Sequence, residues 1–593
     1  MALLKVVFMA VEPGYGASTL IHAPAVIAGG LSMDISMSAY LVSPVLLGLI
    51  AGIWWRPRYG MTVLKTWTWI ISAFIAIVWA VDAATLPFWD VKLDFTPLFY
   101  FFSSPKAAVA SVPWWASALG VVLIALLTFG IYKFMSLSFR ILRGFVKPAT
   151  VRARILATAG MLVIAGLMII PIRGGIGVST MNPGRAYFGT DLKLNQAAVN
   201  PGFSLLYSLA HIEKLDKEFR FYDDAEARKI VASFTTPCDT AAAPVVRLRE
   251  GVTRPDIYIV VMESFSAHLL PSLGGEAVAV NVDSIARSGV LFTNFYAESF
   301  RTDRGLVSIL SGYRAMPTIS VMHYTGKFRN MPSLGRELAK AGYNTTYYSG
   351  GDLNFTNKQA YLLATGYKNL VQDRDFPVGK RLSKWGVHDG EVFKRVMSDR
   401  RRGPEPQFTV IQTASSHEPF EVPYHKFDVK QPNAFAYADS CIGAFVRHLA
   451  GRPEWNNTVV VLVPDHWGAW PKVTEPNERH HIPLVLTGGA LAGTPARINT
   501  LGSQSAIAPT LLALLGLDNS MFPQAVNMLD GCDRGHFAWI TEPEWFGLLT
   551  DSGDEAVVDI HTGTLRAAAG DSIRATEGAK AMIQTVYSDI SKR

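Results

Sequence analysis

Three runs rich in valine and isoleucine are each followed closely by residues that can bind a metal or move a proton. Glu263 follows the first run, His417 lies a few residues beyond the second, and Asp465 and His466 follow the third. One such residue alone usually caps a helix or sits in a solvated loop. Two carboxylates and an imidazole at several strand ends form a donor set that suits Mn²⁺, Mg²⁺ or Zn²⁺. Because ligands gather at the carboxyl ends of strands in α/β sheets, we expect a metal site there.

Thr302 is the candidate nucleophile. It stands just before the apolar run Leu306–Leu310, which predicts the start of a helix. An ordinary threonine N-cap would explain this position. The same position would also present helix N–H groups and the positive end of the helix dipole to a phosphoryl oxygen. A metal ion on the hydroxyl would lower its pKa, and Arg304 or Arg301 would neutralise the transferring group.

These residues need a sheet to position them. From residue 256 onward, short β-branched runs alternate with helical ones, which is typical of an α/β domain with a mostly parallel sheet. The clearest predicted strands are Asp256–Met262, Phe408–Gln412, Thr458–Val463 and Ile482–Thr487.

The first third of the chain has a different character. Charged residues make up only 17% of the sequence, below the roughly 25% of a soluble globular domain. A weak membrane-span candidate in Leu3–Leu31 is interrupted by Glu12, Pro13, Gly14 and Gly16, so about five helices are expected. The four clear apolar runs, each near the ~20 residues that cross a bilayer, are Ser36–Trp55, Trp67–Val81 (extendable toward Phe88), Pro113–Tyr132 and Ile155–Ile172.

Basic residues report the orientation of these helices. Residues 1–175 hold 13 Lys and Arg against 5 Asp and Glu, whereas the remainder is nearly neutral. Nine of the 13 fall in two acid-free loops, 56–65 and 133–154, and the 82–112 loop carries three aspartates. By the positive-inside rule the two basic loops are cytoplasmic. We therefore predict a multi-pass protein of the cell membrane with an extracytoplasmic catalytic domain, and the charge offers no support for nucleic-acid binding.

The expected fold class is an N-terminal α-helical transmembrane bundle followed by an α/β domain. The boundaries that we predict are 1–173 for the transmembrane domain, 174–250 for a connector and 251–593 for the catalytic domain. Three cysteines are too few for a disulfide framework, although a bond between Cys238 and Cys532 is possible in an oxidising compartment.

Several separated motifs in order resemble the lipoteichoic acid synthase-like family of the alkaline phosphatase and sulfatase superfamily. The resemblance is strong over about residues 256–490 and extends loosely to the whole chain. The motifs are Asp256-Ile-Tyr-Ile-Val-Val-Met-Glu263, Arg301-Thr-Asp-Arg-Gly305, Tyr348-Ser-Gly-Gly-Asp-Leu-Asn-Phe-Thr-Asn357, Lys384-Trp-Gly-Val-His-Asp389, Ser415-Ser-His-Glu-Pro-Phe420 and Pro464-Asp-His-Trp-Gly468.

The resemblance implies an alkaline phosphatase-like (sulfatase-like) catalytic domain with a metal site, usually manganese. It also implies that Thr302 takes a phosphoglycerol or related phospho-headgroup from a phospholipid donor and passes it to a glycan or lipid acceptor. His417 would contact the phosphate or assist proton transfer, and His480 or His481 would join it. The residues implied as metal ligands are Glu263, Thr302, Asp465 and His466, and those implied to bind substrate are His417, Asn357, Lys358 and His481.

One segment departs from the lipoteichoic acid synthases proper. They carry a His, a Trp and an Arg where this chain has Ser349, Thr356 and Lys358, while Asn357 is retained. Lysine lacks the bidentate fork with which arginine grips phosphate, which weakens the expectation that this chain polymerises glycerol phosphate.

Three other functions compete with a transferase. A phosphatase or phosphodiesterase would use the same residues, with water in place of the acceptor. A sulfatase would need a Cys/Ser-x-Pro-x-Arg motif, and Thr302-Asp-Arg-Gly is not one. A non-catalytic scaffold would tolerate loss of a ligand, yet all four implied ligands are present.

Overall fold

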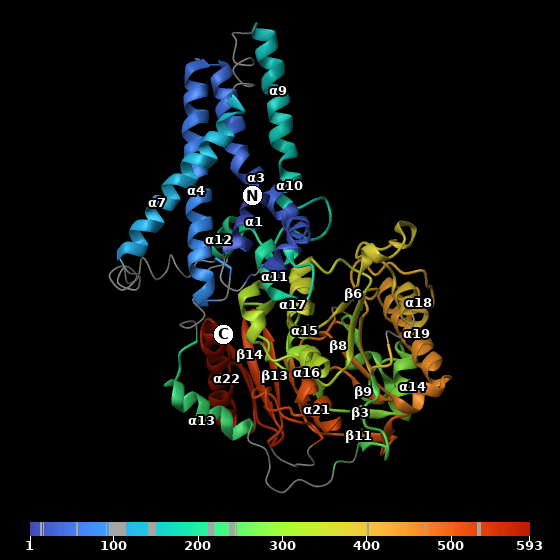
Figure 1. Cartoon of the computed structure of the whole chain (residues 1–593). Helices are drawn as coiled ribbons and strands as arrows, with labels where there is room; N and C mark the ends of the chain where they lie inside the picture. Colours follow the sequence, from blue (N-terminus) through green and yellow to red (C-terminus); the bar gives the residue numbers. More distant parts are fainter. Residues whose placement is uncertain are drawn as a thin grey trace. The chain divides into compact units, whose positions relative to one another are not determined.

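The structure is a computed structural model that divides into two compact units, Met1–Glu213 and Lys214–Arg593 (Figure 1). It describes residues 1–11, 15, 17–54, 57–89, 92–93, 114–139, 150–210, 219–235, 244, 246–399, 403–468, 470–529 and 535–593.

The first unit contains helices and no β-strand in the residues described. Four of its helical segments are long and apolar enough to cross a membrane: Ala23–Trp54, Gly60–Leu86, Trp115–Ser136 and Val151–Arg173. The helices are α1 (Ala2–Val11), α2 (Ala17–Leu20), α3 (Ala23–Trp54), α4 (Pro57–Trp89), α7 (Trp114–Ser136), α9 (Val151–Leu167), α10 (Ile169–Arg173), α11 (Leu192–Ala198) and α12 (Pro201–Ala210).

The four clear predicted spans overlap these segments, although Trp55 and Pro113 at two of their ends lie outside the described residues. Among the described residues, the weak candidate in Leu3–Leu31 does not form a separate span. It is divided among α1, α2 and the beginning of α3. Glu12, Pro13, Gly14 and Gly16, which interrupt this candidate in the sequence, lie outside the described residues. The basic residues Arg56, Arg140, Arg143 and Lys147, which carry much of the orientation argument, lie outside the described residues.

Two lysine–aspartate pairs lie inside this unit. Lys5 on α1 lies 2.9 Å from Asp34 on α3, and the amide of Asn200 donates to the same carboxylate. Lys92 lies 2.6 Å from Asp82 on α4. Because a charge in a low-dielectric interior is costly without a partner, both buried lysines are paired with a carboxylate.

The second unit is built on an eight-stranded sheet in the order β11-β3-β9-β8-β2-β7-β5-β6. The central strands β5, β7, β2 and β8 are parallel and rich in β-branched residues, as expected of strands buried on both faces. The strands are β2 (Asp256–Met262), β3 (Val290–Phe292), β5 (Asn344–Ser349), β6 (Asn369–Val371), β7 (Gln407–Gln412), β8 (Thr458–Pro464), β9 (Leu484–Thr487) and β11 (Ala496–Ile498).

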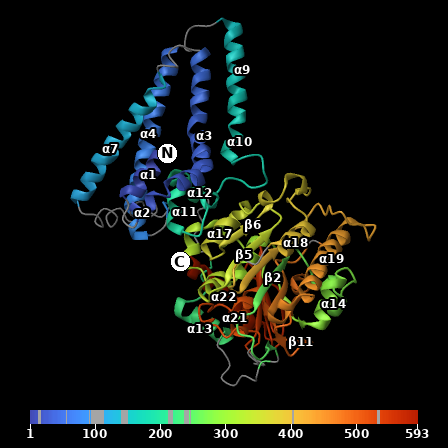
Figure 2. The ribbon, with the colours of Figure 1, turned by 45° about the vertical axis from the view of Figure 1, so that its right-hand side comes forward.

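Helices cover both faces of this sheet (Figures 1 and 2). On one face, α14, α18 and α19 pack on β2, β7, β8 and β9 through a common apolar core. On the other side lie α16, α17 and α21. The bounds are α14 (Val280–Ser288), α15 (Thr302–Ser311), α16 (Leu334–Lys340), α17 (Lys358–Ala364), α18 (Asp389–Ser398), α19 (Lys430–Ala450), α20 (Pro476–His480) and α21 (Ile507–Leu514).

A second, antiparallel sheet completes the unit. Its strands run in the order β13-β14-β15-β16, and α22 packs on β14 and β15 while α13 packs on α22. The bounds are β13 (Phe537–Glu542), β14 (Trp545–Thr550), β15 (Glu555–Asp559), β16 (Leu565–Ala569), α13 (Asp224–Thr235) and α22 (Ser572–Lys592). The short strands β1 (Arg247–Leu248) and β10 (Leu491–Ala492) pair with each other, as do β4 (Phe295–Tyr296) and β12 (Gly502–Ser503).

Of the cysteines, Cys441 is free and partly buried. Cys238 and Cys532 lie outside the described residues, so the disulfide between them stays a prediction.

Candidate active site

The parallel register of the central strands brings the predicted site residues to one edge of the sheet. Met262 at the end of β2 pairs with Pro464 at the end of β8, so Glu263 and Asp465 leave neighbouring strands side by side. Thr413, just beyond β7, accepts a 2.8 Å hydrogen bond from the backbone N–H of Glu263. The short β-branched runs therefore place their following residues together, as expected from parallel topology.

Glu263, Asp465 and His466 form a compact cluster. His466 Nε2 lies 3.5 Å from Glu263 Oε1 and 3.7 Å from Asp465 Oδ2. One donor atom from each of the three residues lies within 4.8 Å of the others. Thr302 Oγ1 lies 3.5 Å from Glu263 Oε2, so the predicted nucleophile meets this cluster.

Backbone and hydroxyl donors hold the carboxylates in place. The N–H groups of Ser264 and His466 both donate to Asp465 Oδ1 at 2.9 Å. The Ser264 hydroxyl donates to Glu263 at 2.7 Å. Ser264 has a φ of 61°, which is uncommon for a residue with a side chain and marks a constrained turn after β2. His466 Nδ1 lies 2.6 Å from the carbonyl oxygen of Trp467, which directs Nε2 toward the acids.

The three side chains of the cluster shift one another's pKa values. Burial and the negative charge of Glu263 raise the pKa of Asp465 to about 7. Burial also acts to raise the pKa of Glu263, but the hydrogen bond and charge of His466 outweigh it and lower that pKa to about 2. Burial acts to lower the pKa of His466, yet the two carboxylates raise it to about 10. Asp465 Oδ2 is buried without a hydrogen-bond partner. Oxygen and nitrogen donors around an unpartnered carboxylate oxygen fit a divalent metal ion.

Thr302 is the first residue of α15, and the N-cap position is occupied by Arg301, whose side chain makes no capping hydrogen bond. The threonine hydroxyl therefore points to the acidic cluster instead of serving as an ordinary N-cap. Gly305 allows the helix to approach, because a Cβ atom there would overlap the carbonyl oxygen of Asp465. The Thr-x-x-Gly spacing thus has a packing reason that sequence reasoning missed.

Lys358 is buried in the same region, with 8% of its side chain exposed. Its ammonium donates to Gln412 Oε1 at 3.2 Å, and the Tyr347 hydroxyl donates to the same oxygen at 2.8 Å. Burial lowers the pKa of Lys358, against the raising effect of nearby carboxylates that include Glu263 and Asp465. Neither Gln412 nor Tyr347 was singled out from the sequence, where both look like ordinary strand residues.

Asn357 lies directly before Lys358 and is buried. Its amide donates to the carbonyl oxygen of Met322 at 3.0 Å. Asn357 and Thr356 have φ angles of 63° and 56°, so two consecutive residues occupy the left-handed region. This tight turn sets the start of α17 and thereby the direction of Lys358.

His417 lies against Trp385, with ring centroids 4.2 Å apart. The carbonyl oxygen of Glu418 accepts a 2.7 Å hydrogen bond from Trp385 Nε1 and lies 3.1 Å from His417 Nδ1. Asp389 accepts hydrogen bonds from the N–H groups of Ala414 and Ser415, which fixes the loop before His417. Trp385 and Asp389 belong to a motif recognised in the sequence, but their contacts with the His417 loop required the structure.

The remaining predicted residues have other contacts. Arg304 donates to the carbonyl oxygens of Met316, Ile319 and Pro317 and lies over the Phe300 ring. These contacts support the 316–319 turn and offer no support for a role at the transferring group. Arg301 is exposed beside Thr302.

The two adjacent histidines, His480 and His481, contact backbone carbonyls of the 293–297 segment. His481 Nε2 lies 3.0 Å from the Thr293 carbonyl oxygen, and its ring lies against Tyr296. His480 is fully buried, with Nδ1 2.6 Å from the Ala297 carbonyl oxygen and Nε2 3.5 Å from Glu542. These contacts join neither ring to the acidic cluster, and a substrate-binding role for His481 stays a prediction.

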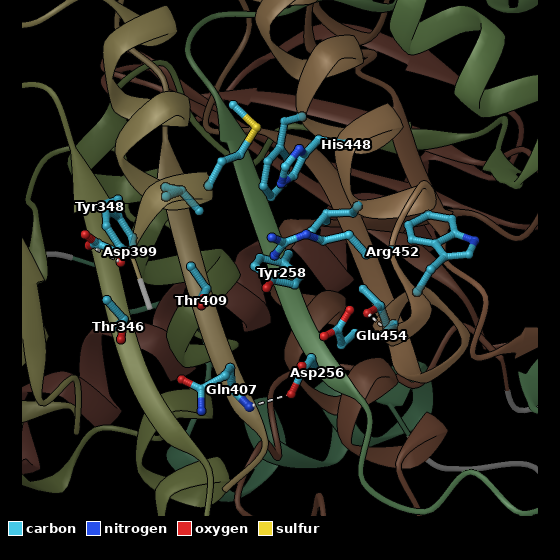
Figure 3. A pocket seen from close by; sticks show the side chains of 16 residues that line it. Asp256, Tyr258, Thr346, Tyr348, Asp399, Gln407, Thr409, His448, Arg452 and Glu454 are labelled. Carbon is cyan, nitrogen blue, oxygen red and sulfur yellow. Dashed lines mark hydrogen bonds between the residues drawn. The ribbon is translucent and has the colours of Figure 1, made fainter. Parts of the chain in front are cut away.

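A cavity of about 120 Å³ lies at the opposite, amino ends of the same strands (Figure 3). Its lining includes Asp256, Tyr258, His448 and Arg452, and the backbone N–H of Gln407 donates to Asp256. None of the residues that line it belongs to the predicted site, so the two features are separate.

The chain is similar in sequence to known proteins. Residues 255–517 match the family model described as Sulfatase. A lipoteichoic acid synthase-like protein of Bacillus subtilis is 20% identical over 313 residues, which cover 48% of this chain and 51% of that protein. Phosphoglycerol transferase I of Escherichia fergusonii is 26% identical over 213 residues, which cover 31% of this chain and 27% of that protein. The match thus spans about half the length of these relatives or less.

Solved structures share the fold. A protein of the alkaline phosphatase superfamily from Vibrio parahaemolyticus matches with a TM-score of 0.56 and 22% identity, covering 64% of this chain and 98% of that one. The lipoteichoic acid synthase LtaP from Listeria monocytogenes matches with a TM-score of 0.50 and 18% identity, covering 62% of this chain and 98% of that one. The predicted fold class, apolar N-terminal helices followed by an alkaline phosphatase-like domain, is confirmed.

Proposed function

Because residues 255–517 form a sulfatase-family domain in a chain similar to lipoteichoic acid synthase-like proteins, we propose that this chain is a membrane-anchored phosphotransferase. It moves a phosphoglycerol or related phospho-headgroup from a phospholipid, through a covalent intermediate on Thr302, to a glycan or lipid acceptor. The catalytic unit works outside the cytoplasm, as the basic loops of the first third predict.

The observation that carries this proposal is the position of Thr302. Its hydroxyl stands 3.5 Å from Glu263 at the first residue of α15, next to a cluster of acid and imidazole groups. A helix of ten residues directs its free N–H groups and positive dipole end toward a phosphoryl oxygen there. A hydroxyl placed for this purpose is what a nucleophilic phosphoryl transfer requires.

Glu263, Thr302, Asp465 and His466 would hold a divalent metal ion, and manganese is the ion that we propose. When bound, the ion lowers the pKa of the Thr302 hydroxyl and offsets negative charge on the phosphate. The unpartnered, buried Oδ2 of Asp465 supports a cation at this point.

The reaction has two balanced halves. In the first, the Thr302 hydroxyl loses its proton and Oγ1 forms a bond to phosphorus, while the bond to the diacylglycerol oxygen breaks and that leaving oxygen takes up a proton. In the second, an acceptor hydroxyl loses its proton and forms the new bond to phosphorus, while the bond to Thr302 Oγ1 breaks and Oγ1 takes up a proton. His417 donates and receives these protons, since the Glu418 carbonyl near Nδ1 leaves Nε2 for substrate.

Two positively charged side chains, Lys358 and Arg301, would contact the phosphate and offset its negative charge. The buried Lys358 ammonium has one protein acceptor, Gln412, and phosphate oxygens would provide others. We propose that Arg301, and not Arg304, contacts the phosphate, because Arg304 already donates hydrogen bonds to three backbone carbonyls.

The experiment uses the full chain in phosphatidylglycerol vesicles with Mn²⁺ and measures diacylglycerol release together with the mass of the Thr302 peptide. We expect release and a phosphoglyceryl adduct on Thr302. Thr302→Ala should abolish both. Ser572→Ala is the matched control, because Ser572 is likewise the first residue of a helix, α22, which packs on the second sheet.

Equal release from wild type and Thr302→Ala would refute the covalent intermediate. Adding candidate glycan and lipid acceptors separates transfer from hydrolysis. If free glycerol phosphate is the product with every acceptor that is added, the result would favour a phosphodiesterase with the same nucleophile.

A further inference from the structure

The segment Arg374–Trp385 lies between β6 and α18 (Figure 1). It combines positive charge with exposed apolar side chains. It holds four basic residues and one acidic residue, a net charge of +3 over twelve positions. Val378 is 77% exposed and Leu382 is 72% exposed. Among large apolar side chains described in the catalytic unit, only Ile573, at 74%, is comparably exposed.

Packing beneath the segment holds these side chains outward. Phe376 is buried in the apolar core below the segment. The Arg381 guanidinium donates to the carbonyl oxygens of Arg374 and Phe376, and the N–H of Arg381 donates to the carbonyl of Val378. The buried Phe376 and the Arg381 hydrogen bonds thus fix the backbone from which Val378 and Leu382 project. Exposing two large apolar side chains to water brings no gain in stability, so we expect this surface to contact something else.

The segment is continuous with the candidate active site. It ends at Trp385, whose ring contacts both His417 and Phe355. A surface that engages the segment therefore lies beside the loop that carries His417.

We propose that the 374–385 segment is the part of the catalytic unit that rests on an anionic bilayer surface. Val378 and Leu382 enter the headgroup region, and Lys384 faces the anionic headgroups. Lys380 lies beside it, with Nζ 3.3 Å from Glu391 and half of its side chain exposed to the headgroups. The proposal rests on the proposed function in one respect, that the donor is a lipid of that bilayer. The contact brings the mouth of the site to the headgroups from which the donor comes.

Charge and area argue for a bilayer over a protein partner. Two apolar side chains and a few cations fall far short of the ~800 Å² per partner that a stable protein interface buries. A lipid surface requires no such area, because many headgroups act together and each nearby Lys or Arg strengthens binding about fivefold.

The test is hydrogen–deuterium exchange of the full chain in nanodiscs of phosphatidylglycerol and of phosphatidylcholine. We expect amides of residues 374–385 to exchange at least tenfold more slowly in the anionic nanodisc. Lys380→Gln with Lys384→Gln removes two charges and should reduce the effect by about 25-fold, which abolishes measurable protection. Leu382→Ser should weaken the protection, whereas Ile573→Ser, at matched exposure, should leave it unchanged.

Exchange that is equal in anionic nanodiscs, zwitterionic nanodiscs and detergent would overturn the proposal, as would protection seen only with an added protein. The readout requires no turnover, so its failure and that of the proposed function are distinguishable. Normal protection without diacylglycerol release would count against the transferase and leave the bilayer contact standing.

Discussion

Gly305 offers a sharp test of how the helix that carries Thr302 meets the Asp465 loop. An added Cβ atom would stand well inside the 3.0 Å that real Cβ atoms keep from other atoms, and its neighbour is the backbone carbonyl of Asp465. The obstacle is backbone in a buried region, so no flexible side chain can yield. Either α15 or the loop must shift by about 1 Å in Gly305→Ala.

The shift has a predictable cost. Thr302 is three residues before Gly305 on the same helix, so it moves relative to Glu263 and Asp465. A misplacement of ~1 Å in a reacting group costs about 100-fold in rate. Overpacking of this kind costs about 1–3 kcal/mol of stability, which a domain of this size can tolerate while remaining folded.

The assay compares single-turnover diacylglycerol release and thermal melting of the full chain for wild type and Gly305→Ala. Gly160→Ala in α9 is the matched control, because a Cβ atom on that helical glycine would have no other atom within 4 Å. We expect the control to keep full activity. A Gly305→Ala chain that releases diacylglycerol within threefold of wild type would refute the geometric argument.

Other changes give further tests. Trp385→Phe keeps an aromatic ring against His417 but removes the N–H that donates to the Glu418 carbonyl, so turnover should fall about fivefold. In Trp385→Leu, turnover should fall further and the pH profile of turnover should shift. An unchanged pH profile would exclude a positioning role for Trp385. Lys358→Met removes the proposed charge-assisted contact with the phosphate, which is worth about 1.5–3 kcal/mol. The variant should therefore lower kcat/KM by ~10- to 150-fold, mainly by raising KM for the lipid donor. An unaffected KM would contradict the phosphate contact. Burial raises the pKa of Asp389 from 3.8 to about 6. Between these two pH values the folded chain holds a proton that the unfolded chain has released, so the stability of the fold falls as the pH rises from about 4 to about 6. Asp389→Asn should remove up to about 3 kcal/mol of that dependence in melting experiments from pH 4 to 7, and parallel curves for both chains would contradict it. Chelation by EDTA should abolish diacylglycerol release and Mn²⁺ should restore it, while activity that survives exhaustive chelation would exclude the metal.

Local patterns were sufficient for the coarse architecture. Apolar runs such as Trp67–Val81 lie inside long helices because a span near twenty residues has few other ways to satisfy its backbone. The β-branched runs before Glu263 and Asp465 are strands of one parallel sheet, and parallel register then requires their following residues to be neighbours. Placing three of the metal-binding candidates together therefore needed only strand position and topology.

Contacts between distant segments could not be predicted in the same way. Arg304 follows Thr302 by two residues, yet its guanidinium donates hydrogen bonds to carbonyl oxygens of the 316–319 turn. His481 faces Thr293, and Lys358 reaches the acidic site only because two residues before it adopt left-handed backbone angles. Residue type and spacing thus determined the long apolar helices, the strands that precede Glu263 and Asp465, and the candidate ligand set of this protein. Tertiary packing decided which nearby cations and imidazoles face that set, because side-chain direction depends on partners remote in the chain.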